Sequence, residues 1–577
     1  MFESIYWNRR RARSRLLSKG SLNLPIPPVM SVHSHHPPSY TKTLRDSEDK
    51  KRIPAPSHRH AAPSAPWPWI DIHDGIDAEQ LASEAPPIPR PCDHKECTCW
   101  IGYPQSRFPN WTEAQVERSR IADAIKNYNK NVACVIYHVD VDTQGFFTDA
   151  GKIEAPEHDK ETTWKIVVDN QRPDNLRVRA LFLENLSGPV LQMLGAKFNI
   201  EPFFFSSSLS WIPSRYQEEI QPGKGDHITI SLTFLKSLEG QYSTTRGNNG
   251  SIHTSNTIAS TDDDRLTVTE QMIDTQAPLR LRSSRRILVL DLLSVHLIRH
   301  VDGSTIISYH PSSHDHTTPA SYLHDRIRFA GQSVYWQNIF QKSPDPTFVL
   351  LTFVWHAMYA WDEALQHLYT HICWLETKVL GTQNMELTQE LHIIRAHHLH
   401  YSSLLEDFQK TVKFIQNTPN PAMQSASKED QENGTSWMRR ECANLLSEID
   451  RLEMGRRMQD KRLKNVMNLV FSRMKQIAYL TMVFLPASFV AAVFGMNIKE
   501  VAPDTHGTLP HYLLVAVPLT VATIWIVVAF QSRYIFPEGT SFWVRMGWPV
   551  TLCLKLLQDK LRPENQHEGT AGEEKTV

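Results

Sequence analysis

The residues best suited to ion chemistry stand together at the end of a long uncharged stretch, in the triplet Gly495-Met496-Asn497. Mg²⁺ sheds its water reluctantly and is usually held through its waters, and the amide oxygen of Asn497 could hydrogen-bond to such a water shell. A carboxylate would bind more tightly, whereas conduction requires binding weak enough for the ion to leave. Gly495 allows tight backbone geometry, and we interpret Met496 as a packing residue. Alternatively, Asn497 only caps a helix end.

The sequence has two uncharged runs: 476–498, which contains this triplet near its end, and 512–530. A bilayer core of about 30 Å needs about 20 helical residues, and prolines such as Pro486 and Pro518 are tolerated in membrane helices. The alternative is a pair of buried helices in a soluble protein. We expect transmembrane helices at 476–498 and 511–531, joined by an outer loop at 499–510. Glu500 and Asp504 in this loop could attract cations to an outer mouth, or they are ordinary loop charges.

Charged flanks predict the orientation of these spans. Basic residues precede the first run and follow the second, whereas the loop contains a single basic residue, Lys499, together with the acidic Glu500 and Asp504. The positive-inside rule therefore places both termini inside. The seven cysteines are scattered mostly singly, unlike a secreted disulfide framework. We expect a multi-pass protein of the plasma membrane, with the vacuolar or mitochondrial inner membrane as alternatives.

Upstream, composition divides the chain into segments. Residues 1–125 are rich in Pro, Ser and His and are expected to be a disordered tail. Residues 126–320 are expected to form a mixed α/β domain, with strands at 133–139, 164–168, 178–183, 228–234, 286–293 and 305–309, a short helix at 186–194 and a disordered insertion at 241–264. A helical region at 321–435 follows, and residues 532–577 are expected to be an amphipathic segment and tail.

A stalk helix is predicted at 436–475, beginning after a polar loop, with Ser436 as a possible cap. Its apolar residues recur at sums of three and four positions, as in a helix seam or coiled coil: Leu445, Ile449, Leu452, Leu463, Val466 and Val470. Arg456 and Gln459 interrupt the seam with polar groups.

The triplet at the exit of the first of two terminal spans, after a long helix and a mid-span proline, resembles the CorA family of magnesium channels. The resemblance implies a ring oligomer, a homopentamer, that conducts magnesium or a related divalent metal ion. Its fold would be an α/β cytosolic domain followed by a stalk helix and a two-helix transmembrane hairpin. Magnesium would be the transported ion and also a regulatory ligand. Membrane lipid and other copies of the chain would be the partners.

The resemblance also implies roles for single residues. The first span would line the pore with Met474, Ile477, Thr481, Leu485 and Ser488, and Gly495, Met496 and Asn497 would form the selectivity filter. Met474 and Leu485 fall where the family has apolar gates. Phe471 falls where the family often has a pore-facing asparagine, and this departure argues against an inner ion site. Asp460 falls where the family has an acidic residue between subunits that senses internal magnesium; alternatively, it is a solvated stalk charge.

Several other features of the sequence bear on possible sites. Net charge is −1, so nothing points to nucleic acid, and no phosphate loop or nucleophile arrangement indicates an enzyme. Cys92, His94, Cys97 and Cys99 are zinc-capable, but structural zinc sites usually pair two separated clusters, which argues against metal here. We interpret His392, His397, His398 and His400 as a hydrated helix face. The alternatives to a magnesium channel are a carrier of zinc or another divalent ion on the same scaffold and a non-conducting, membrane-anchored sensor or scaffold.

Overall fold

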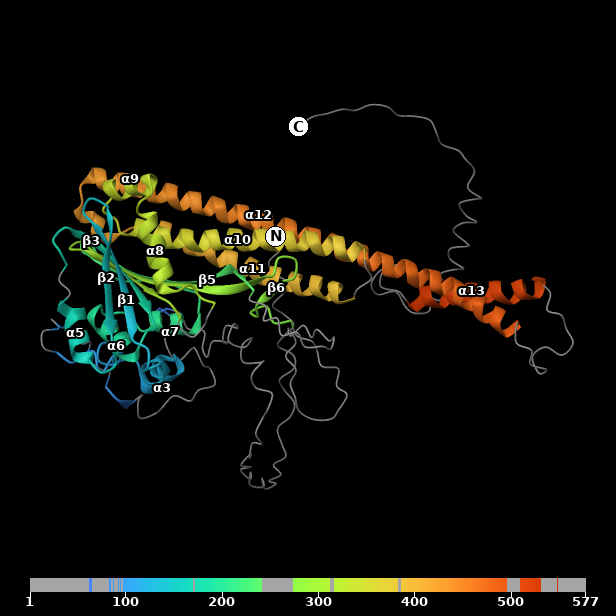
Figure 1. Cartoon of the computed structure of the whole chain (residues 1–577), viewed down its shortest axis with the longest axis horizontal. Coiled ribbons are helices and arrows are strands. Elements are labelled where there is room, and N and C mark those ends of the chain that lie inside the picture. The colour runs from blue at the N-terminus through green and yellow to red at the C-terminus, as the bar shows by residue number, and fades with distance from the viewer. Residues whose placement is uncertain are drawn as a thin grey trace, which may run out of the picture. The chain divides into compact units, whose positions relative to one another are not determined.

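The computed structural model describes most of the chain beyond its first hundred residues. The described residues are 62–64, 82–84, 87, 92, 94, 97–169, 172–240, 273–311, 316–381, 385–494, 509–530 and 547. The expected insertion at 241–264, the outer loop at 499–508 and nearly all of the expected tail at 532–577 lie outside them. Figure 1 shows the order of the elements along the chain.

An eight-stranded mixed sheet forms the centre of the described N-terminal part. The order is β2-β1-β3-β8-β7-β5-β4, with β6 paired to β7. β3 and β8 run parallel, and the other pairs are antiparallel. The strands are β1 (Cys134–Asp142), β2 (Phe147–Ala155), β3 (Leu176–Glu184), β4 (Ser214–Gln221), β5 (Gly225–Glu239), β6 (Leu279–Leu281), β7 (Arg286–His300) and β8 (Ser304–Tyr309).

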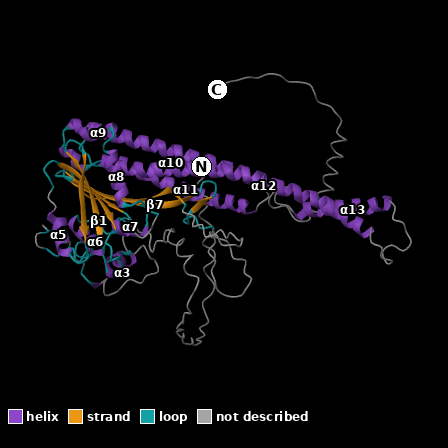
Figure 2. Ribbon diagram, in the orientation of Figure 1, coloured by secondary structure: helices purple, strands orange, loops and turns teal. Residues whose placement is uncertain are grey.

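Helices cover this sheet, so its central strands are buried along most of their length, as expected for near-continuous apolar runs. α7 (Phe203–Ser210) places Phe204 against His296 of β7, with ring centroids 5.3 Å apart. α10 (Thr347–Gly381) stacks Phe353 on Phe182 of β3 at 5.5 Å. Figure 2 shows the long helices as separate purple rods beside the orange strands. The prediction of a mixed α/β domain followed by long helices is confirmed.

The shorter helices are α3 (Glu113–Arg118), α4 (Ile121–Lys126), α5 (Lys160–Asp169), α6 (Gly188–Lys197), α8 (Ala320–Ala330) and α9 (Val334–Lys342). The expected disordered tail is wrong for residues 97–125. There Tyr103, Trp111 and Ile121 are buried, and a capping box between Thr112 and Gln115 begins α3. Burial of these large apolar side chains opposes the entropy cost of ordering the segment.

A second correction concerns residues 164–168, which we expected to form a strand and which lie in α5. Trp164 and Val167 are buried three positions apart, on one face of the helix. The Asp159 carboxylate accepts a hydrogen bond from the Thr162 backbone N–H at the start of the helix. A short apolar run with β-branched residues does not separate a strand from a buried helix.

Three long helices follow the sheet: α10, α11 (Met385–Asn417) and α12 (Lys428–Phe494). The 3-10 helix η1 (Pro421–Ser425) connects the last two, and α13 (Leu509–Phe530) ends the described helices. α12 begins at Lys428, not after Ser436, because the Ser427 hydroxyl accepts from the Asp430 backbone N–H and caps it. At 1.5 Å per residue, α12 is about 100 Å long.

The predicted seam of α12 is buried within the chain, against α10 and α11. Leu445, Ile449 and Leu463 are at most 1% exposed. The interrupting polar residues form hydrogen bonds in the same interface: Arg456 donates to the His398 carbonyl at 3.1 Å, and Gln459 donates from its amide nitrogen to the Leu365 carbonyl at 3.1 Å. The spacing that suggested a coiled coil therefore serves packing within one chain.

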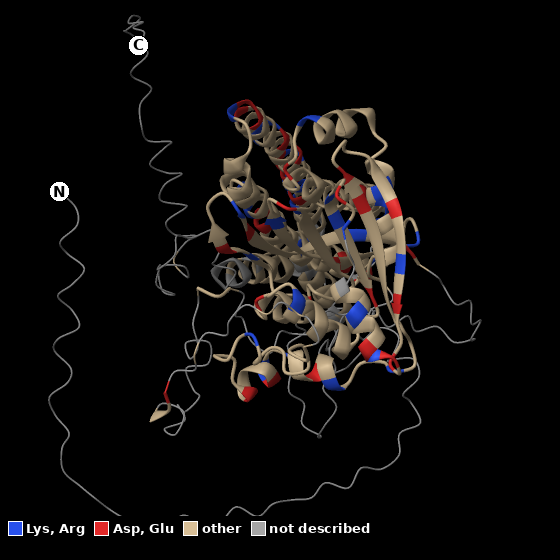
Figure 3. Ribbon diagram, turned by 90° about the vertical axis from the view of Figure 1, so that its left-hand side faces the viewer, with Lys and Arg blue, Asp and Glu red and all other residues tan. Residues whose placement is uncertain are grey.

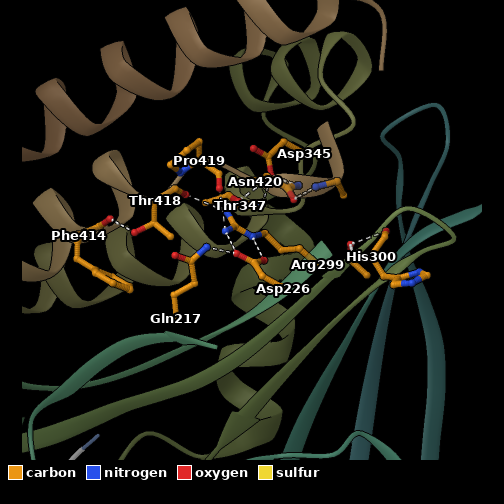
Figure 4. A network of polar contacts seen from close by, with 12 residues as sticks. Gln217, Asp226, Arg299, His300, Asp345, Thr347, Phe414, Thr418, Pro419 and Asn420 are labelled. Atoms are coloured by element: carbon orange, nitrogen blue, oxygen red, sulfur yellow. Dashed lines mark hydrogen bonds and ion pairs between the residues drawn. The ribbon is translucent and has the colours of Figure 1, made fainter. Parts of the chain in front are cut away.

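A buried ion pair joins the sheet to these helices (Figure 4). Arg299 of β7 and Asp226 of β5 have fully buried side chains, and Arg299 Nε donates to Asp226 Oδ1 at 2.6 Å. Arg299 also donates to Thr347 Oγ1 at 3.2 Å and to the Thr418 carbonyl at 3.1 Å. One guanidinium therefore links two strands to the start of α10 and to the segment after α11.

Candidate ion pathway and metal-binding residues

Three of the predicted pore-lining residues lie on one exposed face of α12. Thr481, Leu485 and Ser488 are four and three positions apart, so their side chains share a face, and all three are exposed, Leu485 by 69%. Pro486 and Val490 are buried instead. At about 100° per residue, these two lie on the opposite side of the helix. The structure thus groups the predicted lining residues on the face that the chain itself leaves uncovered.

α13 contacts the C-terminal part of α12, and its Ala516 is 4% exposed. Large apolar side chains remain exposed on both helices, more than water would favour on a soluble surface: Phe484, Leu485 and Phe489 on α12, and Leu513, Leu514, Val515, Val517, Leu519, Val521 and Trp525 on α13. Contiguous exposed apolar surface of this kind is typical of an interaction site.

Within the part of the chain that the structure describes, no helix has the length and apolar character needed to cross a membrane. The two predicted spans are therefore not confirmed and stay predictions.

The predicted selectivity filter lies outside the described residues. This holds for Gly495, Met496 and Asn497, and also for Glu500 and Asp504. Met474 and Ile477 lie on α12, in a stretch where only the backbone is described. The assignment of these residues to the filter, pore and outer mouth remains a prediction.

Asp460, the predicted magnesium sensor, is paired with cations of its own chain. Its Oδ2 lies 2.6 Å from Lys464 Nζ, and its Oδ1 lies 4.0 Å from Arg395 Nε on α11. Its side chain is 17% exposed, and so it keeps some access to water. A metal ion would have to compete with the Lys464 ammonium for this carboxylate.

Phe471, the departure from the family pattern, is 40% exposed. Its ring meets the His392 ring edge-on, with centroids 6.2 Å apart. This residue is therefore held partly by α11 of the same chain.

The row of histidines on α11 is not the hydrated face that we expected. His397 and His398 are at most 1% exposed, whereas His392 is exposed and His400 is half-buried. Burial lowers the pKa of His397 and of His398 to about 4, so both are neutral at pH 7. The four histidines point to different sides of α11. Because α10 and α12 pack against this helix, few of its sides remain in water.

Two groups of potential metal ligands occur among the described residues, and sequence reasoning missed one of them. Glu218, His227 and His296 come from β4, β5 and β7, and their ligand atoms lie within 4.8 Å of one another. Strand register brings them together, since Glu218 pairs with His227 and Thr229 pairs with His296. Only the pairing of strands far apart in sequence could have revealed this group.

Electrostatics favour neutral forms for this buried group. Burial, then the Glu201 and Glu219 carboxylates, raise the pKa of Glu218 to about 9. Burial lowers the pKa of His227 and, further, of His296. Glu218 is therefore protonated at pH 7. Among the described residues, Glu218 Oε1, His227 Nδ1 and His296 Nε2 are buried and find no hydrogen-bond partner.

The second group is the set predicted from sequence to be a poor zinc site: Cys92, His94, Cys97 and Cys99. Their ligand atoms also lie within 4.8 Å of one another, so the structure brings all four together.

Across the described strands and helices, Figure 3 shows acidic and basic residues interspersed.

Comparison with known proteins gives one family match. Residues 301–531 match the profile of the family described as CorA-like Mg²⁺ transporter protein. This segment runs from the end of β7 through α13 and contains the Gly495-Met496-Asn497 triplet. No curated protein matches the sequence.

Solved structures show distant similarity. The CorA magnesium transporter from Methanocaldococcus jannaschii is 13% identical, over 70% of this chain and 98% of its own, with a TM-score of 0.34. The soluble domain of CorA from the same organism is 12% identical, over 58% and 96%, with a TM-score of 0.34. The full-length CmaX protein is 10% identical, over 70% and 99%, with a TM-score of 0.33. The resemblance expected from the triplet is confirmed, because residues 301–531 match the CorA-like Mg²⁺ transporter family.

Proposed function

We propose that this chain is one subunit of a homopentameric membrane channel for magnesium or a related divalent metal ion. The observation that carries the proposal is the match of residues 301–531 to a family of Mg²⁺ transporters. A ring is also required physically, since two spans per chain cannot enclose a pore alone and cyclic symmetry is the common solution.

In this proposal the C-terminal part of α12 lines the pore and α13 packs outside it. The exposed face of Thr481, Leu485 and Ser488 supports this arrangement because it points away from Pro486 and Val490 on the buried side. Met474 and Ile477 continue the same helix inward. Leu485 would form an apolar constriction that opens and closes by wetting and dewetting.

The filter would be a ring of Asn497 amides, with Gly495 and Met496 shaping the backbone before it. Amide oxygens hydrogen-bond to the water of a hydrated cation and release it readily. Glu500 and Asp504 would raise the local concentration of cations at the outer mouth.

We further propose that 476–498 and 511–531 cross the membrane. The uncharged sequence and the exposed apolar side chains of α12 and α13 support this placement. Both termini would lie inside, in the plasma membrane by preference, with the vacuolar or mitochondrial inner membrane as the alternatives.

Regulation by internal magnesium would act through Asp460. Bound metal would bridge neighbouring subunits and favour a closed ring, and its loss would release the stalks. Because Lys464 and Arg395 already face this carboxylate, metal binding would require their displacement, which predicts weak affinity suited to millimolar ion concentrations.

Two other functions fit the same scaffold. One is a carrier for zinc or another divalent ion, since amide oxygens alone do not exclude such ions. The other is a non-conducting, membrane-anchored sensor or scaffold, which the aromatic Phe471 in place of an amide favours.

Ion flux into vesicles containing the purified chain separates these functions. We expect Mg²⁺ uptake that other divalent ions compete for, and at least a tenfold loss of uptake in Asn497→Ala. Asn433→Ala, which changes an exposed asparagine near the start of α12, is the matched control and should conduct normally. Unchanged flux in Asn497→Ala would refute the filter assignment. Absence of flux for every divalent ion would favour the scaffold.

A further inference from the structure

We propose that Cys92, His94, Cys97 and Cys99 bind one structural zinc ion, which fixes the segment before α3 onto the α/β domain. The site lies outside the proposed ion pathway, and it would exist whether or not the chain conducts. Three thiolates and one imidazole are a common ligand set for structural zinc.

The spacing of the ligand atoms carries this proposal. Cys97 Sγ lies 3.7 Å from His94 Nδ1, and Cys99 Sγ lies 3.4 Å from the same nitrogen. Tetrahedral zinc, with Zn–S bonds of about 2.3 Å and a Zn–N bond of about 2.0 Å, places sulfur and nitrogen about 3.6 Å apart. Both distances therefore match a shared zinc ion to within about 0.2 Å.

The spacing of the sulfur atoms also approaches that of a zinc site. Cys97 Sγ and Cys99 Sγ are 3.3 Å apart, and tetrahedral zinc would place them about 3.8 Å apart, so binding requires a shift of about 0.5 Å. A disulfide would require a sulfur–sulfur distance of about 2.05 Å, a larger change. Cys92 Sγ belongs to the same group and accepts from the His94 backbone N–H at 3.4 Å.

The backbone around these ligands is anchored to the domain. Trp164 of α5 donates from Nε1 to the Cys97 carbonyl at 3.1 Å, and its ring meets the His94 ring edge-on at 5.7 Å. Ser106 donates to the Cys99 carbonyl at 2.6 Å. His94 itself has φ of 58°, a left-handed conformation that histidine tolerates better than most residues. These contacts hold the ligands in position before a metal ion arrives.

Charge explains why a metal, and not a cluster of free thiolates, suits this site. Three thiolates so close together repel one another, and a Zn²⁺ ion reduces the total charge from −3 to −1. The ligands span only residues 92–99, a shorter range than the two-cluster pattern on which sequence reasoning relied. The turn at His94 makes one short loop sufficient.

The test measures zinc in the full chain, purified in detergent under reducing conditions and dialysed against metal-free buffer. We expect one zinc per chain by mass spectrometry of the metal, and a loss of at least 80% of it in Cys97→Ser and in His94→Ala. Cys373→Ser, a half-buried cysteine of α10, is the matched control and should keep its zinc. Asn497→Ala should also keep it, which separates this site from ions held in the pore.

A second measurement needs no variant that could misfold. In the wild-type chain, zinc should protect Cys92, Cys97 and Cys99 from alkylation. A strong chelator should raise the alkylation rate of these three cysteines at least tenfold and leave the alkylation rate of Cys373 unchanged. Cobalt loading should give the intense visible bands of a tetrahedral thiolate site. Less than 0.2 zinc per chain, zinc retention by Cys97→Ser, or a Cys97–Cys99 disulfide in freshly isolated protein would overturn the proposal.

Discussion

Replacing Arg299 by methionine removes the cation from the buried joint between the sheet and the long helices. The Asp226 carboxylate, 0% exposed, then loses its ion-pair partner, and the Thr418 carbonyl loses a donor. Breaking a fully buried ion pair in this way costs about 3–5 kcal/mol. Because a protein of ordinary stability has only about 5–15 kcal/mol in total, we expect the melting temperature of the full chain to fall by on the order of 10 °C.

The double variant Asp226→Leu/Arg299→Met separates the cost of an orphaned charge from the value of the pair. Replacing both partners by apolar residues of similar size is often close to neutral, so the double variant should recover most of the loss. The matched control is Arg451→Met, which breaks an exposed pair with Asp362 and should cost less than about 1 kcal/mol. Thermal unfolding of the purified chains measures all of these.

Two results would refute this reasoning. If Arg299→Met melts within 1 °C of the wild type, as the control should, the joint does not stabilise the fold. If the double variant is as unstable as Arg299→Met, the packing of Arg299, and not the unpaired carboxylate, sets the cost.

Three further predictions follow from the buried histidines, the stalk and the pore. Burial lowers the pKa of five histidines from 6.5 to about 4: His138, His310, His356, His397 and His398. Below pH 6.5 each of them takes up a proton when the chain unfolds. Each therefore lowers the free energy of unfolding by up to about 1.4 kcal/mol per pH unit as the pH falls to about 4. Glu201 and Glu218, whose pKa values are raised to about 7 and about 9, increase stability as the pH falls, but they are fewer than the histidines. Denaturant unfolding should therefore show a net loss of stability from pH 6.5 to pH 5. A stability that does not change over this range would contradict the prediction. Asp460→Asn should weaken inhibition of flux by internal Mg²⁺ at least threefold while Glu406→Gln, another paired helix carboxylate, should not; equal inhibition in both would leave Asp460 an ordinary stalk charge. Leu485→Asn should raise resting flux severalfold because a polar constriction stays wet, whereas Val521→Asn on α13 should not; equal flux through wild type and Leu485→Asn would exclude Leu485 as a gate.

Sequence reasoning succeeded where the signal was long and periodic. Short apolar, β-prone runs predicted most of the central strands, such as β7, and the seam of Leu445, Ile449 and Leu463 predicted a buried face of α12. The triplet after an uncharged run predicted the family resemblance, which depends on local sequence alone.

The errors have physical causes in tertiary contacts. Residues 164–168 carry strand-forming side chains but pack as a helix, because Trp164 and Val167 need the same buried face. Residues 97–125 looked too polar to fold, yet Tyr103 and Trp111 are buried by the sheet and its helices. Glu218, His227 and His296 meet only through strand pairing. The zinc-capable set was recognised from sequence, but its short span argued against metal, and only the structure shows that its four ligand atoms lie within 4.8 Å of one another.

The uptake of Mg²⁺ by vesicles that contain only this chain tests the central claim most directly. Our account predicts uptake that falls at least tenfold in Asn497→Ala and stays normal in Asn433→Ala. Equal uptake by wild type and Asn497→Ala, or no uptake above that of empty vesicles, would contradict it.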